Sequence, residues 1–540
     1  MTEPRATATL DGLLSAHAGS TPERIALRLP RGTGFRTTTY SRLDARVNAL
    51  AAGLLHAGVE PGMRTALLVP PVEDFFALAF ALLRLRAVPV LIDPGIGRAN
   101  VKGCLAQAAP RAFVGVAKAH LARRLLGWAP TAEVLVTAGP GAAAAGPILG
   151  SHSVRAVEQA GRWRQPFLPT QRAQGAAAAI LFTSGSTGPP KGVEHGEEQL
   201  LAQAQLVRSL YDLEPGEVSL STFPPFALFG PVLGLTTVVP RMDATRPARV
   251  VPARVVRAAD RYGATVMFGS PALLDTVSRG GGQMPSLRRV ISAGAPVPRS
   301  TQRRTLAQLG PGAQVHTPYG ATEALPVATI GSTELLALPD DGICVGRPVP
   351  GVDVVLIGIS DDPIVELTPD LLVTRPGEVG EVLVRGPVVS AAYADRPDAT
   401  AAAKVRWGGQ VAHRMGDLAS WDADGRLWFA GRKAHVVRTA AGPMYSVPCE
   451  EVFNLHPAVR RCALVAVGPA GESTPVLCVE LEPGVATSSQ LTQQLLATGR
   501  ADPRTRVIAR ILYHPALPVD IRHNSKIDRA QLGRWAARQP

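Results

Sequence analysis

The chain has 540 residues, of which 46% are hydrophobic, so it is long enough for at least two folded domains with sizeable cores. Its formal net charge of +13 comes from basic residues that are scattered along the chain rather than clustered with aromatic ones, which argues against nucleic-acid binding. The five cysteines have neither metal-site spacing nor the even number of a disulfide framework, and we expect buried, reduced thiols.

The N-terminal residues lack the basic and apolar regions of a secretory signal. The most apolar stretch, 75–83, is about half as long as a membrane-spanning helix needs to be. We therefore expect a cytoplasmic protein without a membrane span.

The first half of the chain alternates between helix and strand patterns. Ser41 is placed to cap a helix that runs to about His56, and a second helix is expected over 74–85. Apolar runs predict strands over 65–69, 88–92, 112–116 and 134–136. The stretch 139–150 (GPGAAAAGPILG) is typical of a flexible surface loop. This βαβ alternation, repeated from about residue 176 to 291, predicts largely parallel sheets covered by helices.

An apolar strand pattern over 178–182 leads into a segment of small hydroxyl residues and glycines, followed by two prolines and Lys191. Backbone N–H groups and hydroxyls in such a segment suit phosphate oxygens, and the lysine adds positive charge. It is not a Walker A loop, because Pro190 precedes Lys191 and Gly192 stands at the Ser/Thr position. An ordinary Ser/Gly loop is the alternative. The predicted phosphate-binding residues are Thr183, Ser184, Gly185, Ser186, Thr187, Gly188 and Lys191.

This segment resembles the signature phosphate loop of the ANL superfamily, which contains acyl-CoA synthetases, luciferases and peptide-synthetase adenylation domains. Two further motifs follow in the family's order: SAGAP at 292–296 is similar to its adenine-side loop, and YGATE at 319–323 matches Y-G-x-T-E. The resemblance implies that Thr322 bonds a phosphate oxygen and that Glu323 holds Mg²⁺, a hard cation that needs a carboxylate. The adenine-binding residues that it implies are Gly294, Ala295, Pro296, Tyr319 and Gly320.

From 345 to 385 the pattern changes to short strands with turns, which predicts a small, more antiparallel β unit. In the MGD motif that follows, Asp417 matches the family carboxylate that accepts the ribose hydroxyls. Arg432 belongs to the Gly-Arg pair at the end of the family's large domain. The resemblance thus assigns Asp417 and Arg432 to the ribose.

After residue 431 the strand and helix patterns restart, which predicts two α/β units. Residues 1–431 form a large AMP-binding domain of stacked βαβ-type sheets plus the small β unit. Residues 432–540 form a small, mobile α+β lid. Within the lid, NSKIDR at 524–529 is similar to the family's N-x-G-K-I-x-R motif. The resemblance implies that Lys526 is catalytic, together with Thr322 and Glu323, and that the cofactors are ATP and Mg²⁺.

Several departures from the family pattern point to one branch. GRKAHVV at 431–437 replaces the usual acidic hinge sequence, and the acyl-pocket segment PFALFG at 225–230 lacks the usual histidine. Together with YGATEALPV and HRMGDL, these departures resemble the olefin-pathway β-lactone synthetases. The acyl-pocket residues are then Phe226, Ala227, Phe229 and Gly230.

That branch implies a long-chain β-hydroxy acid as substrate, often with an α-alkyl branch. ATP would convert the acid to an acyl-AMP with release of pyrophosphate. The β-hydroxyl would then attack its own carbonyl carbon and release AMP and a β-lactone, helped by the high effective concentration of an intramolecular nucleophile. The resemblance also suggests other enzymes of a hydrocarbon or β-lactone pathway as partners.

Two alternatives stand beside this prediction. In the first, the same half-reaction delivers the acyl group to coenzyme A or to a carrier protein, as in fatty acyl ligases. In the second, the protein binds adenylates without catalysis. The presence of Lys191, Glu323, Asp417 and Lys526 argues against the second alternative.

Overall fold

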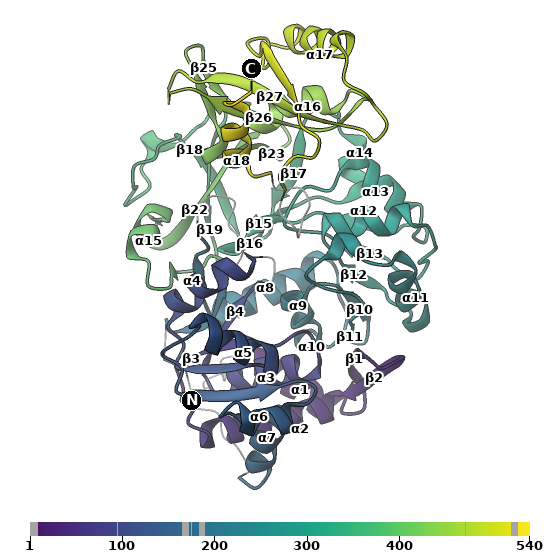
Figure 1. Ribbon diagram of the computed structural model, residues 1–540, viewed down its shortest axis with the longest axis vertical. Helices are drawn as coiled ribbons and strands as arrows, with labels where there is room; N and C mark the ends of the chain where they lie inside the picture. The colour runs from purple at the N-terminus through teal and green to yellow at the C-terminus, as the bar shows by residue number, and fades with distance from the viewer. Residues whose placement is uncertain are drawn as a thin grey trace, which may run out of the picture.

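The computed structural model describes residues 9–93, 96–164, 172–173, 175–182, 189–469, 471–519 and 527–539. The N-terminal half lies at the bottom of Figure 1, with two sheets whose strands are largely parallel. An antiparallel sheet lies above them, and the last hundred or so residues form the top of the molecule. The predicted α/β class is confirmed.

One largely parallel sheet has the strand order β20–β9–β8–β4–β3–β5–β6–β7, in which β9 runs antiparallel to both of its neighbours, β8 and β20. Its strands are β3 (Arg64–Leu68), β4 (Val88–Ile92), β5 (Ala112–Val116), β6 (Val134–Ala138), β7 (His152–Ser153), β8 (Ala177–Phe182), β9 (Gly192–Gly196) and β20 (Ala392–Tyr393). The helices of this region are α1 (Leu10–Ser20), α2 (Tyr40–His56), α3 (Glu73–Arg84), α4 (Arg98–Ala108), α5 (Ala117–Leu126), α6 (Ala142–Ile148) and α7 (Val154–Arg162).

The second sheet has the order β14–β13–β12–β10–β11–β1–β2, parallel except for the edge strand β2. Its strands are β1 (Ile25–Arg31), β2 (Gly34–Thr39), β10 (Val218–Ser221), β11 (Thr236–Val238), β12 (Val266–Phe268), β13 (Arg289–Ile291) and β14 (Gln314–His316). The accompanying helices are α8 (Glu197–Leu210), α9 (Pro224–Ala227), α10 (Phe229–Val232), η2 (Pro247–Arg249), α11 (Pro252–Tyr262), α12 (Pro271–Arg279) and α13 (Arg299–Leu306).

The third sheet is antiparallel, as expected for the β unit, and has the order β15–β16–β17–β23–β22–β19–β18 with β21 paired to β22. Its strands are β15 (Tyr319–Ala321), β16 (Ala324–Thr329), β17 (Ile343–Pro348), β18 (Asp353–Ile357), β19 (Gly380–Arg385), β21 (Lys404–Trp407), β22 (Gln410–Trp421) and β23 (Leu427–Arg432). The helical segments between them are α14 (Ser332–Ala337), η3 (Pro369–Leu371) and α15 (Pro397–Ala403).

Beyond Arg432 the chain builds separate small sheets, β24–β25 and β26–β27–β28, with hydrophobic clusters of their own. The elements are η4 (Lys433–His435), β24 (Val437–Thr439), β25 (Gly442–Met444), α16 (Ser446–Asn454), β26 (Val459–Val467), β27 (Thr474–Leu481), α17 (Ser489–Ala501), β28 (Arg510–Tyr513) and α18 (Arg529–Ala536). The division of the chain into two domains at residue 432 stays a prediction.

Two local predictions are wrong. The helix for which Ser41 is the expected cap begins at Tyr40, because the hydroxyl of Thr39 accepts the Arg42 N–H and caps the helix instead. The stretch 139–150, expected to be a loop, contains α6, in which a run of alanines provides strong helix formers.

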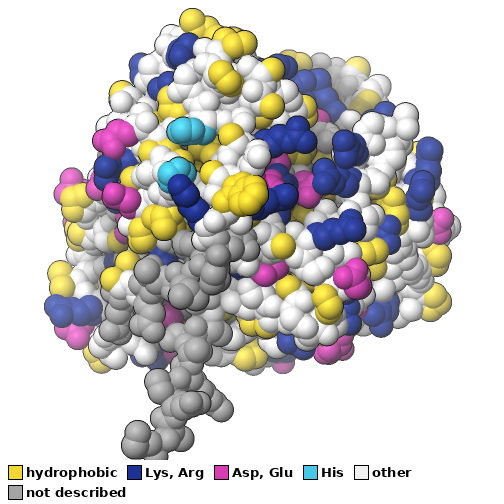
Figure 2. Space-filling model, turned by 90° about the horizontal axis from the view of Figure 1, so that it is seen from below, with side chains coloured by type: hydrophobic (Ala, Val, Ile, Leu, Met, Phe, Trp, Pro, Cys, Tyr) yellow, Lys and Arg dark blue, Asp and Glu magenta, His cyan; other side chains and the backbone are white. Residues whose placement is uncertain are grey.

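The main hydrophobic core fills the space between the two largely parallel sheets and includes side chains of α1, α2 and α3. Seen from below, Lys and Arg side chains lie in separate places with acidic and apolar side chains between them (Figure 2). Within the part of the chain that the structure describes, no helix is long and apolar enough to cross a membrane.

Candidate active site

A cavity of about 920 Å³ takes its walls from all of the large sheets. Strands β8 and β9 contribute from the first sheet, α9, α10 and β12 from the second, and β15, β16, β22 and β23 from the third. The cavity therefore lies where the segments singled out in the sequence converge.

A hydrogen bond and an ion pair connect three side chains beside this cavity, those of Tyr319, Asp417 and Arg432. The Tyr319 hydroxyl donates to Oδ2 of Asp417 at 2.8 Å, and Nε of Arg432 lies 3.0 Å from Oδ1 of the same carboxylate. Burial and the Asp417 charge hold the pKa of Tyr319 well above its ordinary value. Gly416 has a φ of +63°, which glycine tolerates, and the register of β22 against β19 shifts around it. The structure thus brings together residues predicted for adenine and for ribose.

Glu323 is held by a residue that the sequence motifs do not include. The Tyr393 hydroxyl donates to Oε1 of Glu323 at 2.6 Å, and the Ser390 N–H donates to the Glu323 carbonyl at 2.8 Å. Nζ of Lys191 lies 5.0 Å from the centroid of the Tyr393 ring, within cation–π range. The candidate Mg²⁺ ligand and the candidate phosphate lysine therefore contact the same tyrosine.

Lys404 lies beside this group, and its Nζ donates to the carbonyl and hydroxyl oxygens of Ser390 at 2.6 and 3.1 Å. Burial lowers the pKa of Lys404 to about 7, although attraction by Glu323 opposes the shift. His413 lines the cavity nearby, and burial followed by the Lys404 charge holds its pKa well below the ordinary value. A chain with six lysines thus places one of them in the buried surroundings of Glu323.

A buried ionic cluster lines the cavity next to the end of β23. Oε2 of Glu381 lies 2.7 Å from Nη2 of Arg414 and 3.2 Å from Nζ of Lys433, and the Glu381 side chain is 1% exposed. Lys433 also donates to the Ser360 carbonyl at 2.8 Å. Lys433, which belongs to the unusual hinge sequence, therefore forms an ion pair with Glu381 of the antiparallel sheet.

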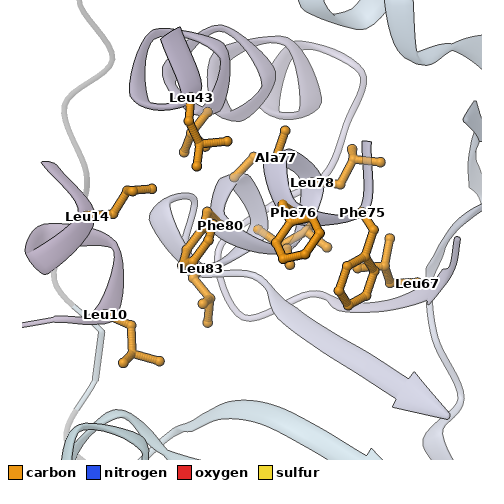
Figure 3. Packing of buried hydrophobic residues seen from close by; sticks show 14 of the residues in the cluster. Leu10, Leu14, Leu43, Leu67, Phe75, Phe76, Ala77, Leu78, Phe80 and Leu83 are labelled. Carbon is orange, nitrogen blue, oxygen red and sulfur yellow. The ribbon is translucent and has the colours of Figure 1, made fainter. Parts of the chain in front are cut away.

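Part of the cavity wall is made of apolar side chains from α1, β3 and α3, and we call this part the apolar arm. Leu10, Leu67, Phe75, Phe80 and Leu83 line this arm. Figure 3 shows Leu10 and Leu83 near each other, Phe80 next to Leu83, and Leu67 of β3 close to Phe75 of α3. Such a lining of aliphatic and aromatic side chains suits an alkyl chain.

Two leucines of this arm, Leu10 and Leu83, are each followed in the chain by a charged residue. Asp11 follows Leu10, and its carboxylate lies 2.7 Å from Nη1 of Arg86 and 3.5 Å from Nε of Arg84, the residue after Leu83. The Arg84 and Asp11 side chains are 3% and 4% exposed. The residues that follow Leu10 and Leu83 in the chain therefore belong to a buried ion cluster.

The predicted acyl-pocket residues divide into two groups. Phe226 lines the cavity and stacks on Phe268 with ring centroids 4.0 Å apart, and Phe229 lines it nearby. Ala227 and Gly230 are buried beside the wall rather than on it. A Cβ on Gly230 would lie 1.9 Å from the Thr237 hydroxyl, so this glycine serves close packing.

The comparisons with known proteins agree with this geometry. Residues 14–394 match the AMP-binding enzyme family. Olefin β-lactone synthetase from Xanthomonas campestris pv. campestris is 47% identical, covering 96% of this chain and 95% of that protein. The enzyme of the same name from Stenotrophomonas maltophilia is 46% identical, covering 96% of each.

The chain belongs to the AMP-binding enzyme family.

Among solved structures, the amide bond synthetase McbA from Marinactinospora thermotolerans has a TM-score of 0.79 at 24% identity, covering 98% of this chain and 100% of that one. This similarity concerns the fold. The family membership makes the protein an ATP-dependent adenylate-forming ligase, and its resemblance to the olefin β-lactone synthetases is confirmed.

Two sets of residues predicted for this adenylate-forming enzyme lie outside the described residues. They are the phosphate loop Thr183, Ser184, Gly185, Ser186, Thr187 and Gly188, and the lysine Lys526. On the C-terminal side of Lys526, Nη1 of Arg529 lies 2.7 Å from Oε1 of the buried Glu450. This ion pair anchors the start of α18 against α16.

The other predicted residues of the family's site separate by position. Gly294, Gly320, Thr322, Glu323 and Arg432 line the cavity. Ala295 and Pro296 do not line it, although both follow Gly294 directly. Sequence reasoning missed Tyr393 and Lys404. The scarcity of lysine in the chain was an available signal for Lys404 alone.

Proposed function

We propose that the protein is a β-lactone synthetase that acts on long-chain β-hydroxy acids. The observation that carries the proposal is a single cavity with a charged end around Glu323, Lys191 and Arg432 and an apolar arm along α3. The charged end suits a nucleotide, and the arm suits an alkyl chain. Identity of 46–47% to olefin β-lactone synthetases over nearly the whole chain supports the choice of product.

In the first half-reaction, a carboxylate oxygen of the acid attacks the α-phosphorus of ATP, and pyrophosphate leaves. Lys191 and Arg432 supply positive charge at this end of the cavity. Asp417 accepts hydrogen bonds from the ribose hydroxyls, which replace the Tyr319 hydroxyl as its donor. We assign the adenine to Gly294, Gly320 and Tyr319, and the phosphates to the loop 183–188 and Thr322. Lys526 bridges the carboxylate and the α-phosphate during the attack.

Glu323 is the residue that would hold Mg²⁺. A partly exposed carboxylate fits this ion, since Mg²⁺ in nucleotide sites takes one or two carboxylates and completes its shell with phosphate oxygens and water. When bound, the ion would neutralise charge on the phosphates. Tyr393 and Ser390 fix the carboxylate and the backbone of Glu323 in place.

In the second half-reaction, the β-hydroxyl oxygen attacks the acyl carbonyl carbon. The bond between that carbon and the AMP oxygen breaks, the hydroxyl proton is lost, and a four-membered lactone and AMP result. The apolar arm holds the chain so that hydroxyl and carbonyl stay close, which makes the attack effectively unimolecular. An external thiol has no part in this step.

We further propose that residues 432–540 act as a lid that carries Lys526. Their separate sheets and cores support a division at this point. A cytoplasmic location accords with the five cysteines, which are all buried free thiols. Enzymes that supply the β-hydroxy acid and consume the lactone are the expected partners.

The test is product analysis with ATP, Mg²⁺ and a racemic long-chain β-hydroxy acid, in the absence of any thiol. We expect continuous release of AMP and pyrophosphate, and a β-lactone in the NMR spectrum of the product. A single burst of pyrophosphate, followed by turnover and thioester formation once coenzyme A is added, would instead identify an acyl-CoA ligase.

A further inference from the structure

His195 is a buried histidine on the wall of the cavity. It lies on β9, opposite Ala179 of β8, and its residue surface is 1% exposed. His195, Ala179, Leu200 and Gln203 are all among the residues that line the cavity. His195 is thus one of the residues that line the cavity, and its side chain is almost completely buried.

Neither ring nitrogen of His195 has a hydrogen-bond partner within the described parts of the chain. Other buried histidines differ in this respect. Nε2 of His120 contacts the Val136 carbonyl at 3.0 Å, and His413 is hydrogen-bonded to the backbone of Ala403. Because a buried polar group without a partner destabilises the fold, a bound molecule that satisfies the His195 ring is favoured.

The charge state of His195 limits the kind of molecule that suits it. Burial, followed by the nearby Lys404 charge, lowers the pKa of His195 to about 4, so the ring is neutral at pH 7. A neutral imidazole offers one N–H donor and one bare nitrogen acceptor. It does not attract a carboxylate strongly, and its low basicity favours hydrogen bonding over proton abstraction. A hydroxyl, which both donates and accepts, matches it.

The position of His195 places that hydroxyl near the reacting end of the substrate. His195 lies on β9, which pairs with β20, and the hydroxyl of Tyr393 on β20 donates to Glu323. The arm lined by Leu10 and Leu83 is apolar and suits the tail instead. A hydroxyl close to the carboxyl group is therefore the one that His195 meets.

We propose that His195 is the specificity residue that binds the β-hydroxyl of the acid. This inference rests on the proposed function and extends it, because it explains how the enzyme selects hydroxylated acids. A fatty acid without the β-hydroxyl would expel water from the cavity and leave the His195 imidazole without a hydrogen-bond partner. Discrimination of roughly tenfold is expected from one such buried polar group.

The experiment compares a 3-hydroxy acid with the unsubstituted acid of equal length, using ATP-dependent pyrophosphate release. For His195→Leu we expect kcat/KM for the hydroxy acid to fall roughly tenfold, while the value for the plain acid stays level or rises. His195→Asn, which keeps a donor and an acceptor, should restore part of the preference. The melting temperature of His195→Leu should equal or exceed that of the wild type, because an unsatisfied polar group has been removed.

His120→Leu is the matched control, since His120 is also buried but does not line the cavity; its ratio of the two kcat/KM values should equal that of the wild type. An unchanged ratio in His195→Leu, or an equal fall for both acids, would overturn the role of His195. A wild-type enzyme that activates neither acid would instead overturn the proposed function, so the two failures are distinct.

Discussion

Tyr393 links the groups that handle the phosphates. Its hydroxyl donates to Glu323, and Lys191 and Lys404 lie 5.0 and 6.0 Å from its ring centroid. The ring therefore lies close to two ammonium groups while its hydroxyl fixes a carboxylate. A substitution that keeps the ring and deletes the hydroxyl separates these two roles.

Tyr393→Phe should raise the Mg²⁺ concentration needed for half-maximal pyrophosphate release and lower kcat/KM for ATP about tenfold. The reason is that Glu323 loses the partner that orients it, and partners of metal-binding carboxylates contribute on this scale. A Mg²⁺ titration of the exchange reaction measures the effect. Tyr40→Phe is the control, because that hydroxyl donates to the Leu235 carbonyl away from the cavity. Wild-type Mg²⁺ dependence in Tyr393→Phe would rule out this role.

At the scale of single elements, the sequence pattern predicts some strands to the residue. The strands expected over 88–92 and 112–116 are β4 and β5, since continuous apolar runs are typical of strands buried on both faces. Helix α6 was not predictable in this way, because glycines and prolines surround its alanines. The partnership of Tyr393 with Glu323, 70 residues apart, depends on strand pairing that one sequence does not reveal.

We expect the packing of α1 on α3 to limit the length of the acid that the apolar arm accepts. Leu83→Phe should shorten the longest acid that the enzyme accepts, because the larger ring fills the end of the arm. Each methylene that no longer fits should cost about fourfold in kcat/KM, equivalent to about 0.8 kcal/mol. Assays across a series of chain lengths measure the shift.

Leu14→Phe is the matched control for that series. Leu14 is fully buried in the same core but does not line the cavity. Its substitution should lower the melting temperature and leave the chain-length profile unchanged. If the two variants had the same profile, the arm would not be the site of the alkyl chain.

The turn between β22 and β23 is held by Asp422. Burial opposes the ionisation of Asp422, but hydrogen bonds from Trp428 and Arg426 outweigh it and lower its pKa to about 2. The folded state therefore binds the proton more weakly than the unfolded chain does. The stabilisation is fully present above about pH 4 and is lost as the pH falls towards 2.

Asp422→Asn should therefore lower the free energy of unfolding at pH 7 by roughly 1 kcal/mol, a value reduced for solvent screening. The difference between the variant and the wild type should shrink below pH 4. Urea denaturation at a series of pH values measures both effects. A difference that stayed constant down to pH 2 would show that the charge of Asp422 is not what stabilises the turn.

At the scale of the whole molecule, the C-terminal unit contributes few groups to the nucleotide end of the cavity among the residues described. Lys526→Ala should therefore abolish ATP–pyrophosphate exchange and leave the affinity for ATP within about twofold, because ground-state binding relies on other groups. Calorimetric titration with ATP separates the two quantities. Full exchange activity in the variant would remove Lys526 from the mechanism.

The ion cluster of Asp11, Arg84 and Arg86 includes the residues that directly follow Leu10 and Leu83 in the chain, so we expect it to limit the movement of these two leucines. One more methylene on the substrate gains about 0.8 kcal/mol when buried, whereas displacing one member of a buried ion pair costs about 3–5 kcal/mol. A chain that is too long by one or two carbons cannot force Asp11 away from Arg84 and Arg86. The kcat/KM of the enzyme should consequently rise smoothly with the chain length of the acid and then fall abruptly above a maximum length.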